Sequence, residues 1–386
     1  MARLWLRNAR LLDPEAPRES EGGLLLEGGR IAARLGAAER GPDDARQVDL
    51  AGRALAPGLI DLHHHGRAVF CRPDAAAEAV RHDATYLARH GVTAFLVTTL
   101  AWPRGPLARF VAGAREAIEG APQSGAVPLG IHLEGPWIRA EAAGAQPRDG
   151  IRPYREDEAR ELLDRSGGWI RMVTFAPEIA GAAALQQELE RRGILGALGH
   201  SWSQPEDVDR AVERGARHVT HLFNAMSGLH HREPGLVGAG LTDERLTCDL
   251  ICDGFHVHPR AVRLAARALG ERLVLISDRI EPSDGGDFGA GPIRDEAGAW
   301  RLADGRLAGS SLTLERAIAN ANTFAGLSRL EAVAAATLRP ARVLDCEGER
   351  GTLRPGARAD LAIFGADGAV EATWVGGRQV WPETGS

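Results

Sequence analysis

The sequence contains no lysine, and all 46 basic residues among its 386 residues are arginines. Without lysine side chains, the chain cannot use a lysine Schiff base, and it has no P-loop lysine for a nucleotide phosphate. A carboxylated lysine that bridges two metal ions is excluded for the same reason. Any oxygen ligand that bridges two ions must therefore come from aspartate or glutamate.

Cysteine is scarce, and its spacing excludes the common zinc and redox motifs. The four cysteines, Cys71, Cys248, Cys252 and Cys346, form no CxxC pair. Such thiols are normally reduced and buried in a cytoplasmic protein. We expect structural roles for them, and only for Cys71, which follows a histidine-rich segment, does a ligand role stay open.

Long apolar runs and an excess of basic charge are also absent. No stretch reaches the roughly 18 apolar residues of a membrane span, and the first residues, MARLWLRNARLLD, lack a secretory apolar region. The 46 basic and 52 acidic residues give a net charge of −6, which offers no footprint for nucleic acid. We therefore expect a cytoplasmic protein without a membrane or nucleic-acid partner.

Composition separates the two chain ends from a long middle. Residues 1–56 and 341–386 contain short strand-like segments with glycine turns, and we expect them to pair in one small, discontinuous β-sandwich domain. Residues 57–340 are expected to form the larger domain.

Eight short apolar runs alternate with helical segments in this middle part. The runs are 59–65, 92–100, 127–134, 170–176, 194–200, 217–223, 246–252 and 272–278. Helical composition is clearest at 74–90, 156–166, 204–216 and 259–269. Alternating strands and helices predict an α/β fold, a TIM-like (β/α)₈ barrel.

Histidines and carboxylates end five of these runs. They are His63 and His65, Glu134, His200, His221 and Asp278. In a β/α barrel the carboxyl ends of the strands meet on one face, where the active site forms. Imidazole and carboxylate ligands suit zinc, iron or similar ions that activate water. The pattern predicts a metallohydrolase.

Each of these residues also has an ordinary structural explanation. His63 and His65 project to the same side of a strand, but an isolated pair of this kind is more often a polar strand end. Glu134 also fits a helix cap, and His200 or His221 alone fits a buried core histidine. Their shared position at strand ends favours the metal site.

The remaining polar residues are assigned different tasks. Asp278 is favoured as the base that takes a proton from water, with a helix cap as the alternative. His132 shares the face of Glu134 and is expected to support it, whereas His218 is interpreted as structural. Arg232 and His256 could bind an anion, although a solvated arginine explains Arg232 equally well.

With these residues in place, the chain resembles the N-acetylglucosamine-6-phosphate deacetylase family of the amidohydrolase superfamily, nearly from end to end. The shared motifs are PGLIDLHHHG, HLEGPW, GHS, THLFNAM, HHREPG, DGFHVHP, ISD, LAGSSLT and PG with ADL. The resemblance implies hydrolysis of the acetamide of an N-acetyl amino-sugar phosphate, most simply N-acetylglucosamine 6-phosphate, which releases acetate and the free amine. It also implies a homodimer.

The resemblance assigns roles to individual residues. Glu134, His200 and His221 would hold the main divalent ion, and His63 and His65 would complete a second site that some members occupy. Zinc is the first candidate for the one or two ions, with iron, cobalt or manganese as alternatives. Contacts to the sugar phosphate would come from Ala145, Gln146, Asn224, Ala225, Arg232, His256, Leu307, Ala308 and Gly309. Arg232 would reach into a neighbouring subunit.

Two departures from the family pattern leave other functions open. Gln146 stands where members of the family carry a histidine that polarises the acetamide carbonyl; its amide can donate a hydrogen bond to an oxyanion but cannot carry charge. Arg279 follows Asp278 in place of a small residue, near the expected reacting group. One alternative is an amidohydrolase for a different N-acyl or cyclic amide, and another is an inactive barrel that only binds a partner.

Overall fold

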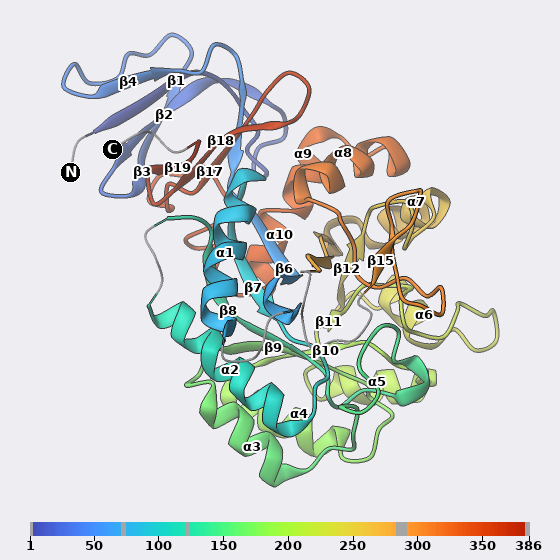
Figure 1. Cartoon of the computed structure of the whole chain (residues 1–386). Coiled ribbons are helices and arrows are strands. Elements are labelled where there is room, and N and C mark those ends of the chain that lie inside the picture. Colours follow the sequence, from blue (N-terminus) through green and yellow to red (C-terminus); the bar gives the residue numbers. More distant parts are fainter. Residues whose placement is uncertain (1–2, 71–74, 121–123, 283–291, 383–386) are drawn as a thin grey trace.

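The computed structural model describes residues 3–70, 75–120, 124–282 and 292–382. It divides the chain between a β/α barrel and a sheet built from both chain ends, which we call the end sheet (Figure 1). Cys71 lies outside the described residues, so its predicted role stays a prediction.

A parallel sheet forms the barrel. Its strands in chain order are β6 (Leu59–Gly66), β7 (Val92–Thr98), β8 (Val127–Glu134), β9 (Ile170–Phe175), β10 (Leu195–Leu198), β11 (His218–Val219), β12 (Thr247–Ile251), β13 (Leu273–Ile276) and β14 (Arg279–Ile280). Each strand from β6 to β13 pairs with the next one along the chain, and β14 pairs with β6. Because β14 directly follows β13 in the chain and pairs with β6, it connects the last long strand of the sheet to the first. All eight strand candidates are confirmed.

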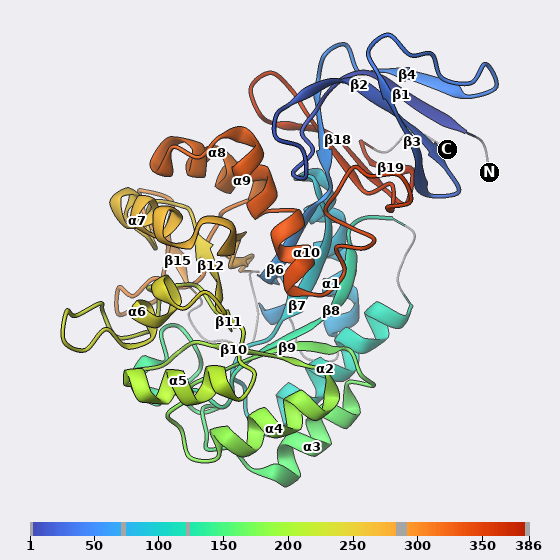
Figure 2. The same cartoon turned by 180° about the vertical axis from the view of Figure 1, so that it is seen from behind.

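Helices cover the outside of the barrel, as Figures 1 and 2 show from opposite sides. They are α1 (Ala76–Arg89), α2 (Arg104–Glu119), α3 (Glu156–Arg165), α4 (Ala182–Arg192), α5 (Pro205–Glu213), α6 (Gly235–Thr242), α7 (Pro259–Leu269), α8 (Leu314–Ala325), α9 (Arg329–Ala335) and α10 (Leu338–Val343). The four predicted helical segments correspond to α1, α3, α5 and α7. A capping box between Gln204 and Asp207, followed by Pro205 in the first turn, starts α5. No helix among the described residues is both long and apolar enough to cross a membrane.

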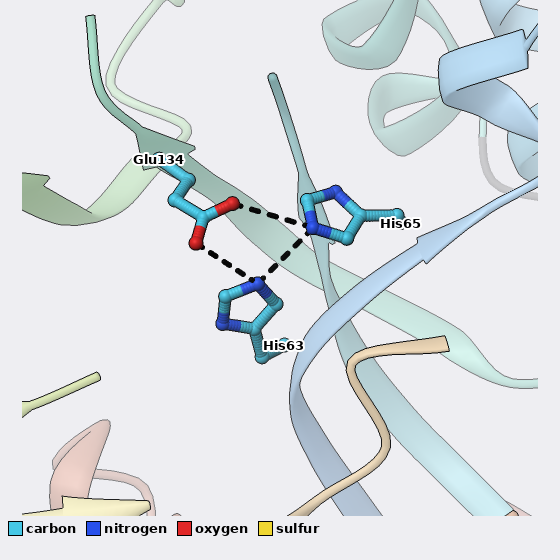
Figure 3. A group of neighbouring side chains, drawn as sticks. All are labelled: His63, His65 and Glu134. Atoms are coloured by element: carbon cyan, nitrogen blue, oxygen red, sulfur yellow. Dashed lines mark hydrogen bonds and ion pairs between the residues drawn. The ribbon is translucent and has the colours of Figure 1, made fainter. Parts of the chain in front are cut away.

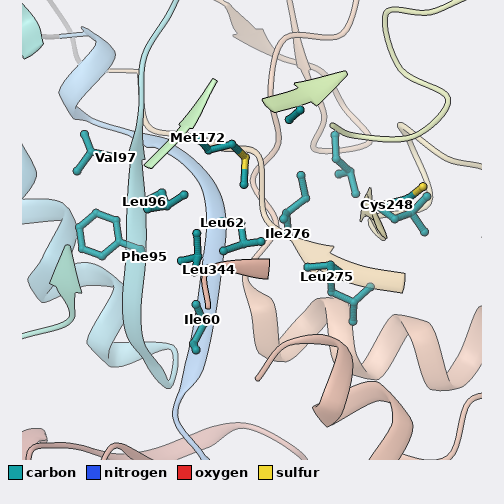
Figure 4. Packing of buried hydrophobic residues seen from close by; sticks show 14 of the residues in the cluster. Ile60, Leu62, Phe95, Leu96, Val97, Met172, Cys248, Leu275, Ile276 and Leu344 are labelled. Carbon is teal, nitrogen blue, oxygen red and sulfur yellow. The ribbon is translucent and has the colours of Figure 1, made fainter. Parts of the chain in front are cut away.

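The barrel strands are apolar on both faces because each strand is covered twice, by the barrel interior and by the helices. All seven residues of β7 and all four of β13 are buried. Figure 4 shows part of the resulting core, in which Leu62, Leu275 and Ile276 belong to one buried cluster. This packing holds the strand ends in place and leaves their last residues to form the site.

The end sheet joins residues from the two ends of the chain. It contains β1 (Leu4–Leu11), β2 (Ser20–Glu27), β3 (Arg30–Gly36), β4 (Arg46–Asp49), β5 (Ala54–Pro57), β17 (Leu361–Phe364), β18 (Val370–Val375) and β19 (Arg378–Trp381). Strand β5 pairs with β1 on one side and with β17 on the other. The predicted fold class, a barrel with a small β unit from both chain ends, is confirmed. The exact domain boundaries at residues 56 and 340 stay a prediction.

Candidate metal centre

Six side chains from five strand ends meet at the carboxyl end of the barrel. His63 and His65 lie on β6 and Glu134 is the last residue of β8, whereas His200, His221 and Asp278 follow β10, β11 and β13. All six are buried, and Asp278 is the most exposed of them at 8%. The structure therefore brings together every residue that the sequence analysis selected as a metal ligand or base.

One group of ligand atoms surrounds an oxygen of Glu134. Its Oε1 atom lies 3.0 Å from His200 Nε2 and 2.9 Å from His221 Nε2. The two Nε2 atoms lie 3.2 Å apart. Two imidazoles and one carboxylate with converging donor atoms match the three protein ligands of a catalytic zinc site.

A second group of possible ligand atoms includes the same carboxylate together with His63 and His65 (Figure 3). Glu134 Oε2 is 3.3 Å from His65 Nε2, and Oε1 is 3.5 Å from His63 Nε2. The Oδ1 atom of Asp278 is 3.3 Å from His65 Nε2 and 3.5 Å from His63 Nε2. Glu134 thus belongs to both three-residue groups whose atoms could hold a cation.

Left-handed backbone conformations turn three of these residues at their strand ends. The φ angles are 49° at His200, 34° at His221 and 46° at Asp278. Residues other than glycine rarely adopt this backbone conformation, which costs on the order of 1–3 kcal/mol per residue. Such strain persists only where the surrounding packing enforces it, and it is typical of functional sites.

Carbonyl groups orient two of the imidazoles. His200 Nδ1 donates to the Ala142 carbonyl at 2.8 Å, and His65 Nδ1 donates to the Thr98 carbonyl at 3.3 Å. Since a carbonyl can only accept, both rings carry their proton on Nδ1 and present Nε2 to the cluster. His221 is held through its backbone N–H, which donates to Asp249.

Two neighbouring histidines are structural. His132 Nε2 pairs with Thr174 Oγ1 at 2.7 Å, and its Nδ1 donates to the Leu62 carbonyl at 3.2 Å. The ring nitrogens of His132 thus contact Thr174 and Leu62, its ring packs edge-on against His63, and the expected support of Glu134 stays a prediction. His218 contacts Thr247 and Asp249, in agreement with its structural interpretation.

The electrostatics of the cluster suit a cation. Burial by itself raises the pKa of Glu134, but His63, His200 and His221 outweigh it and lower the pKa well below its usual value. For Asp278, burial is likewise outweighed by His63 and His65, and its pKa falls to about 2. Burial opposes protonation of His65 and His221, yet the two carboxylates raise their pKa values to about 10 and about 9.

Ionised carboxylates in this cluster thus hold protons on neighbouring imidazoles. A divalent ion bound by the same atoms would take over the positive charge and release those protons. The donor types, the convergence of Nε2 and carboxylate atoms and this charge pattern all fit a metal ion.

A cavity of about 510 Å³ opens next to the cluster. Eight of the nine predicted substrate-binding residues line it, namely Ala145, Gln146, Asn224, Ala225, His256, Leu307, Ala308 and Gly309. Its volume lies in the range of small-molecule sites, about 300–1,000 Å³. His256 donates from Nδ1 to Asp253 at 2.7 Å, which leaves its Nε2 atom free to act in the cavity.

Arg232 and Arg279 lie elsewhere. Arg232 is exposed, contacts His231 Nε2 at 2.9 Å and does not line the cavity of its own chain. The Arg279 guanidinium lies over the Tyr86 ring at 4.3 Å and donates to the Ser311 carbonyl at 3.1 Å. The Arg279 side chain therefore packs against α1 and the 311 segment and does not line the cavity, although its backbone follows Asp278 directly.

The sequence analysis missed several residues of the cavity wall. Val69, Phe70, Leu100, Ile280 and Arg306 all line it. Leu100 closely follows β7 and Ile280 is the last residue of β14, positions that could have identified them. Arg306 precedes the selected Leu307, and its guanidinium donates to the Gly144 carbonyl across the cavity wall.

A parallel β/α barrel with buried imidazoles and carboxylates at its strand ends, beside a cavity, defines a metal-dependent hydrolase. Comparison with known proteins narrows this class. The chain belongs to the amidohydrolase family, whose model matches residues 54–380. Members of this family are hydrolases and are generally metal dependent.

Similar proteins of known name share most of the chain. An N-acetylgalactosamine-6-phosphate deacetylase of Escherichia coli O157:H7 is 37% identical over 84% of this chain and 87% of its own length. An N-acetylglucosamine-6-phosphate deacetylase of Vibrio furnissii is 34% identical over 88% of this chain and 86% of its own.

Among solved structures, a mutant N-acetyl-D-glucosamine-6-phosphate deacetylase from Mycobacterium smegmatis, in complex with N-acetyl-D-glucosamine-6-phosphate, is similar along almost the whole chain. It superimposes with a TM-score of 0.89 at 31% identity and covers 98% of this chain and 100% of that chain.

Proposed function

We propose that this protein is a metal-dependent deacetylase that hydrolyses the acetamide of an N-acetyl amino-sugar 6-phosphate. N-acetylglucosamine 6-phosphate is the first candidate substrate. The observation that carries the proposal is the convergence of Glu134, His200, His221 and Asp278 at one wall of a cavity of about 510 Å³. Relatives with deacetylase names at 34–37% identity support the same chemistry.

Glu134, His200 and His221 would hold the main ion, and His63 and His65 would hold a second ion together with Glu134. Zinc is the first candidate because catalytic zinc sites commonly have three protein ligands with nitrogen or oxygen donor atoms. Iron, cobalt and manganese are the alternatives. The bound ion would lower the pKa of a water molecule and polarise the amide carbonyl.

Asp278 is proposed as the general base and acid. Its carboxylate is ionised at neutral pH, because the His63 and His65 imidazoles outweigh burial and lower its pKa to about 2. A bound ion that replaced the charge of these imidazoles would lower the pKa of the carboxyl in the same direction. Asp278 would accept a proton from the attacking water at Oδ1 and then donate it to the leaving nitrogen. The apolar wall formed by Val69, Phe70, Leu100 and Ile280 would limit access of further water.

The phosphate is proposed to bind in the same cavity. Asn224, Ala225 and His256 would contact it from the same chain, while Leu307, Ala308 and Gly309 would line the sugar. His256 is oriented for this role by its 2.7 Å hydrogen bond to Asp253.

Arg232 is proposed to reach the phosphate from a second subunit. This side chain is exposed and does not line the cavity of its own chain, so it can act only through a neighbouring copy or after a loop movement. The homodimer and the cytoplasmic location belong to this proposal as predictions.

The alternative hypothesis is that the substrate is a different N-acyl or cyclic amide. It is now supported by the departure at Gln146 alone, because Arg279 does not line the cavity. The inactive barrel is not favoured, since all six selected ligand and base residues converge.

A substrate screen combined with elemental analysis tests the proposal. Purified protein should contain a divalent metal and release acetate from N-acetylglucosamine 6-phosphate. The galactosamine epimer should be measured beside it, because the Escherichia coli relative carries that sugar in its name. Unphosphorylated sugars and cyclic amides serve as comparison substrates. Metal-free protein, or equal rates with unphosphorylated amides, would contradict the proposal.

Subunit mixing tests Arg232. Arg232→Ala should raise KM for the phosphorylated sugar by roughly tenfold or more, since a lost charged hydrogen bond typically costs about 1.5–3 kcal/mol. Inactive Asp278→Asn subunits mixed with Arg232→Ala subunits should lower that KM again if the arginine acts across the dimer. No recovery would mean that Arg232 acts in its own chain or not at all.

A further inference from the structure

The side chain of Gln146 is engaged at both of its polar ends. Its Oε1 atom accepts a hydrogen bond from the Ala101 backbone N–H at 2.7 Å, and its Nε2 atom donates to Glu134 Oε2 at 2.5 Å. Only 7% of Gln146 is exposed. A backbone N–H can only donate, so Oε1 must face Ala101 and the NH₂ group must face Glu134. The orientation of the amide is thus determined by its partners.

This contact distinguishes the two oxygens of Glu134. Oε1 lies 3.0 Å from His200 Nε2 and 2.9 Å from His221 Nε2, while Oε2 accepts the hydrogen bond from Gln146 and lies 3.3 Å from His65 Nε2. Among the described residues, every other side chain that contacts this carboxylate is an imidazole of the cluster. Those imidazoles would bind the ion themselves. Gln146 is therefore the side chain that can keep the Glu134 carboxylate from rotating whether or not the ion is bound.

We infer that Gln146 is a positioning residue for metal binding, which holds the Glu134 carboxylate so that Oε1 faces His200 and His221. The inference rests on the proposed metal site. It differs from the role expected for this position, a hydrogen bond to the substrate oxyanion. A positioning role acts on the affinity for the ion, whereas an oxyanion role acts on turnover and leaves that affinity unchanged.

The loop around Gln146 supports this assignment. Ala101, its hydrogen-bond partner, follows β7, and the Arg306 guanidinium donates to the carbonyl of Gly144 in the same loop. The Gln146 backbone N–H donates to the Ala143 carbonyl at 2.9 Å. The side chain therefore acts from a segment that is tied to β7 and to the cavity wall.

Metal affinity of Gln146→Met tests the inference without measuring activity. Methionine has a similar length but cannot donate to Glu134 or accept strongly from Ala101. The apparent Kd for zinc, measured by competition with a coloured chelator, should rise about 10–100-fold, as is typical when a hydrogen-bond partner of a metal ligand is removed.

Gln186→Met is the matched control. Gln186 is also buried, on α4, and its Nε2 atom donates to the Ala211 carbonyl at 2.8 Å, away from the metal ligands. This variant should leave the Kd for zinc unchanged. The cost of burying methionine in place of glutamine is thereby separated from the loss of the contact to Glu134.

A zinc affinity of Gln146→Met equal to that of the wild type, with lower kcat, would overturn the inference and leave the proposed function standing. Wild-type protein that binds no zinc would instead overturn the proposed function itself. If Gln146→Met does not fold, a crystal structure of the zinc-loaded wild type decides. Gln146 Nε2 within hydrogen-bond distance of Glu134 supports the inference, and an amide turned into the cavity overturns it.

Discussion

The end sheet and the carboxyl-terminal rim of the barrel, both well packed, bury opposite kinds of side chain. In the end sheet, fully buried leucines such as Leu6, Leu24 and Leu55 form the core. At the rim, the buried groups are imidazoles and carboxylates, and the backbone is left-handed at His200, His221 and Asp278. Aliphatic burial stabilises the end sheet directly, whereas the rim contains ionisable groups that need one another or a cation.

The difference teaches how stability and function divide in this chain. The end sheet follows local sequence rules, such as the glycine turn of Gly28 and Gly29 between β2 and β3. They are violated at the rim, where buried charges and strained residues concentrate. Such violations persist at functional sites because the surrounding fold is stable enough to enforce them. The following changes act on one region or the other and test whether the two are separable.

The largest effect is expected from Asp278→Asn at the rim. Loss of a positioned acid and base typically lowers kcat by about 10²–10⁴-fold. The ion held by Glu134, His200 and His221 should remain, because Asp278 contacts the other pair of imidazoles. Steady-state acetate release measures kcat, and elemental analysis of the same sample measures the metal content. Near-normal turnover would remove Asp278 from the mechanism.

Leu6→Ala should instead act on stability alone. Leu6 is completely buried in the end sheet, and such truncations cost about 2–5 kcal/mol. Denaturant unfolding measures the loss, with Leu264→Ala as control, since Leu264 on α7 is 49% exposed and its truncation should cost far less. We expect kcat at low temperature to stay at the wild-type value. A lower kcat would show that the end sheet and the rim are coupled.

Metal removal should affect the rim and spare the end sheet. A ligand at 100 times its Kd stabilises a protein by about 2.7 kcal/mol, and this contribution disappears with the ion. Hydrogen exchange after chelation should speed up at residues 198–201 and 219–226. Exchange in β1 and β2 should stay unchanged. Uniform loss of protection would mean that the ion stabilises the whole chain cooperatively.

The smallest effects are expected from two alanines in left-handed conformation. Ala51 has a φ of 49° in an exposed turn of the end region, and Ala225 has a φ of 51° at the cavity wall. Glycine relieves strain of about 1–2 kcal/mol but loses more chain entropy, so each Ala→Gly change should stabilise the protein by about 1 kcal/mol or less. Only Ala225→Gly should raise KM. Equal kinetic effects would contradict a distinct role for the rim.

Most of the fold could be predicted from the sequence because the barrel strands are short apolar runs bounded by helical segments. Glu134, His200 and Asp278 were identified for the same reason, since they stand where an apolar run ends. The hydrogen-bond partners of these residues could not be predicted. The amide of Gln146 faces Glu134, His132 pairs with Thr174, and these contacts join segments far apart in the chain.

The sequence by itself determined the order of strands and helices, the pairing of the two chain ends and the set of ligand-type side chains, because local periodicity and residue chemistry carry that information. Only the tertiary structure decided that the Glu134 carboxylate belongs to two groups of possible metal ligands, that Arg279 packs against Tyr86 and that Arg232 stays outside its own cavity. The physical reason is that the direction of a side chain in a loop depends on packing between segments that are distant in the sequence. The local sequence pattern contains no information on that packing.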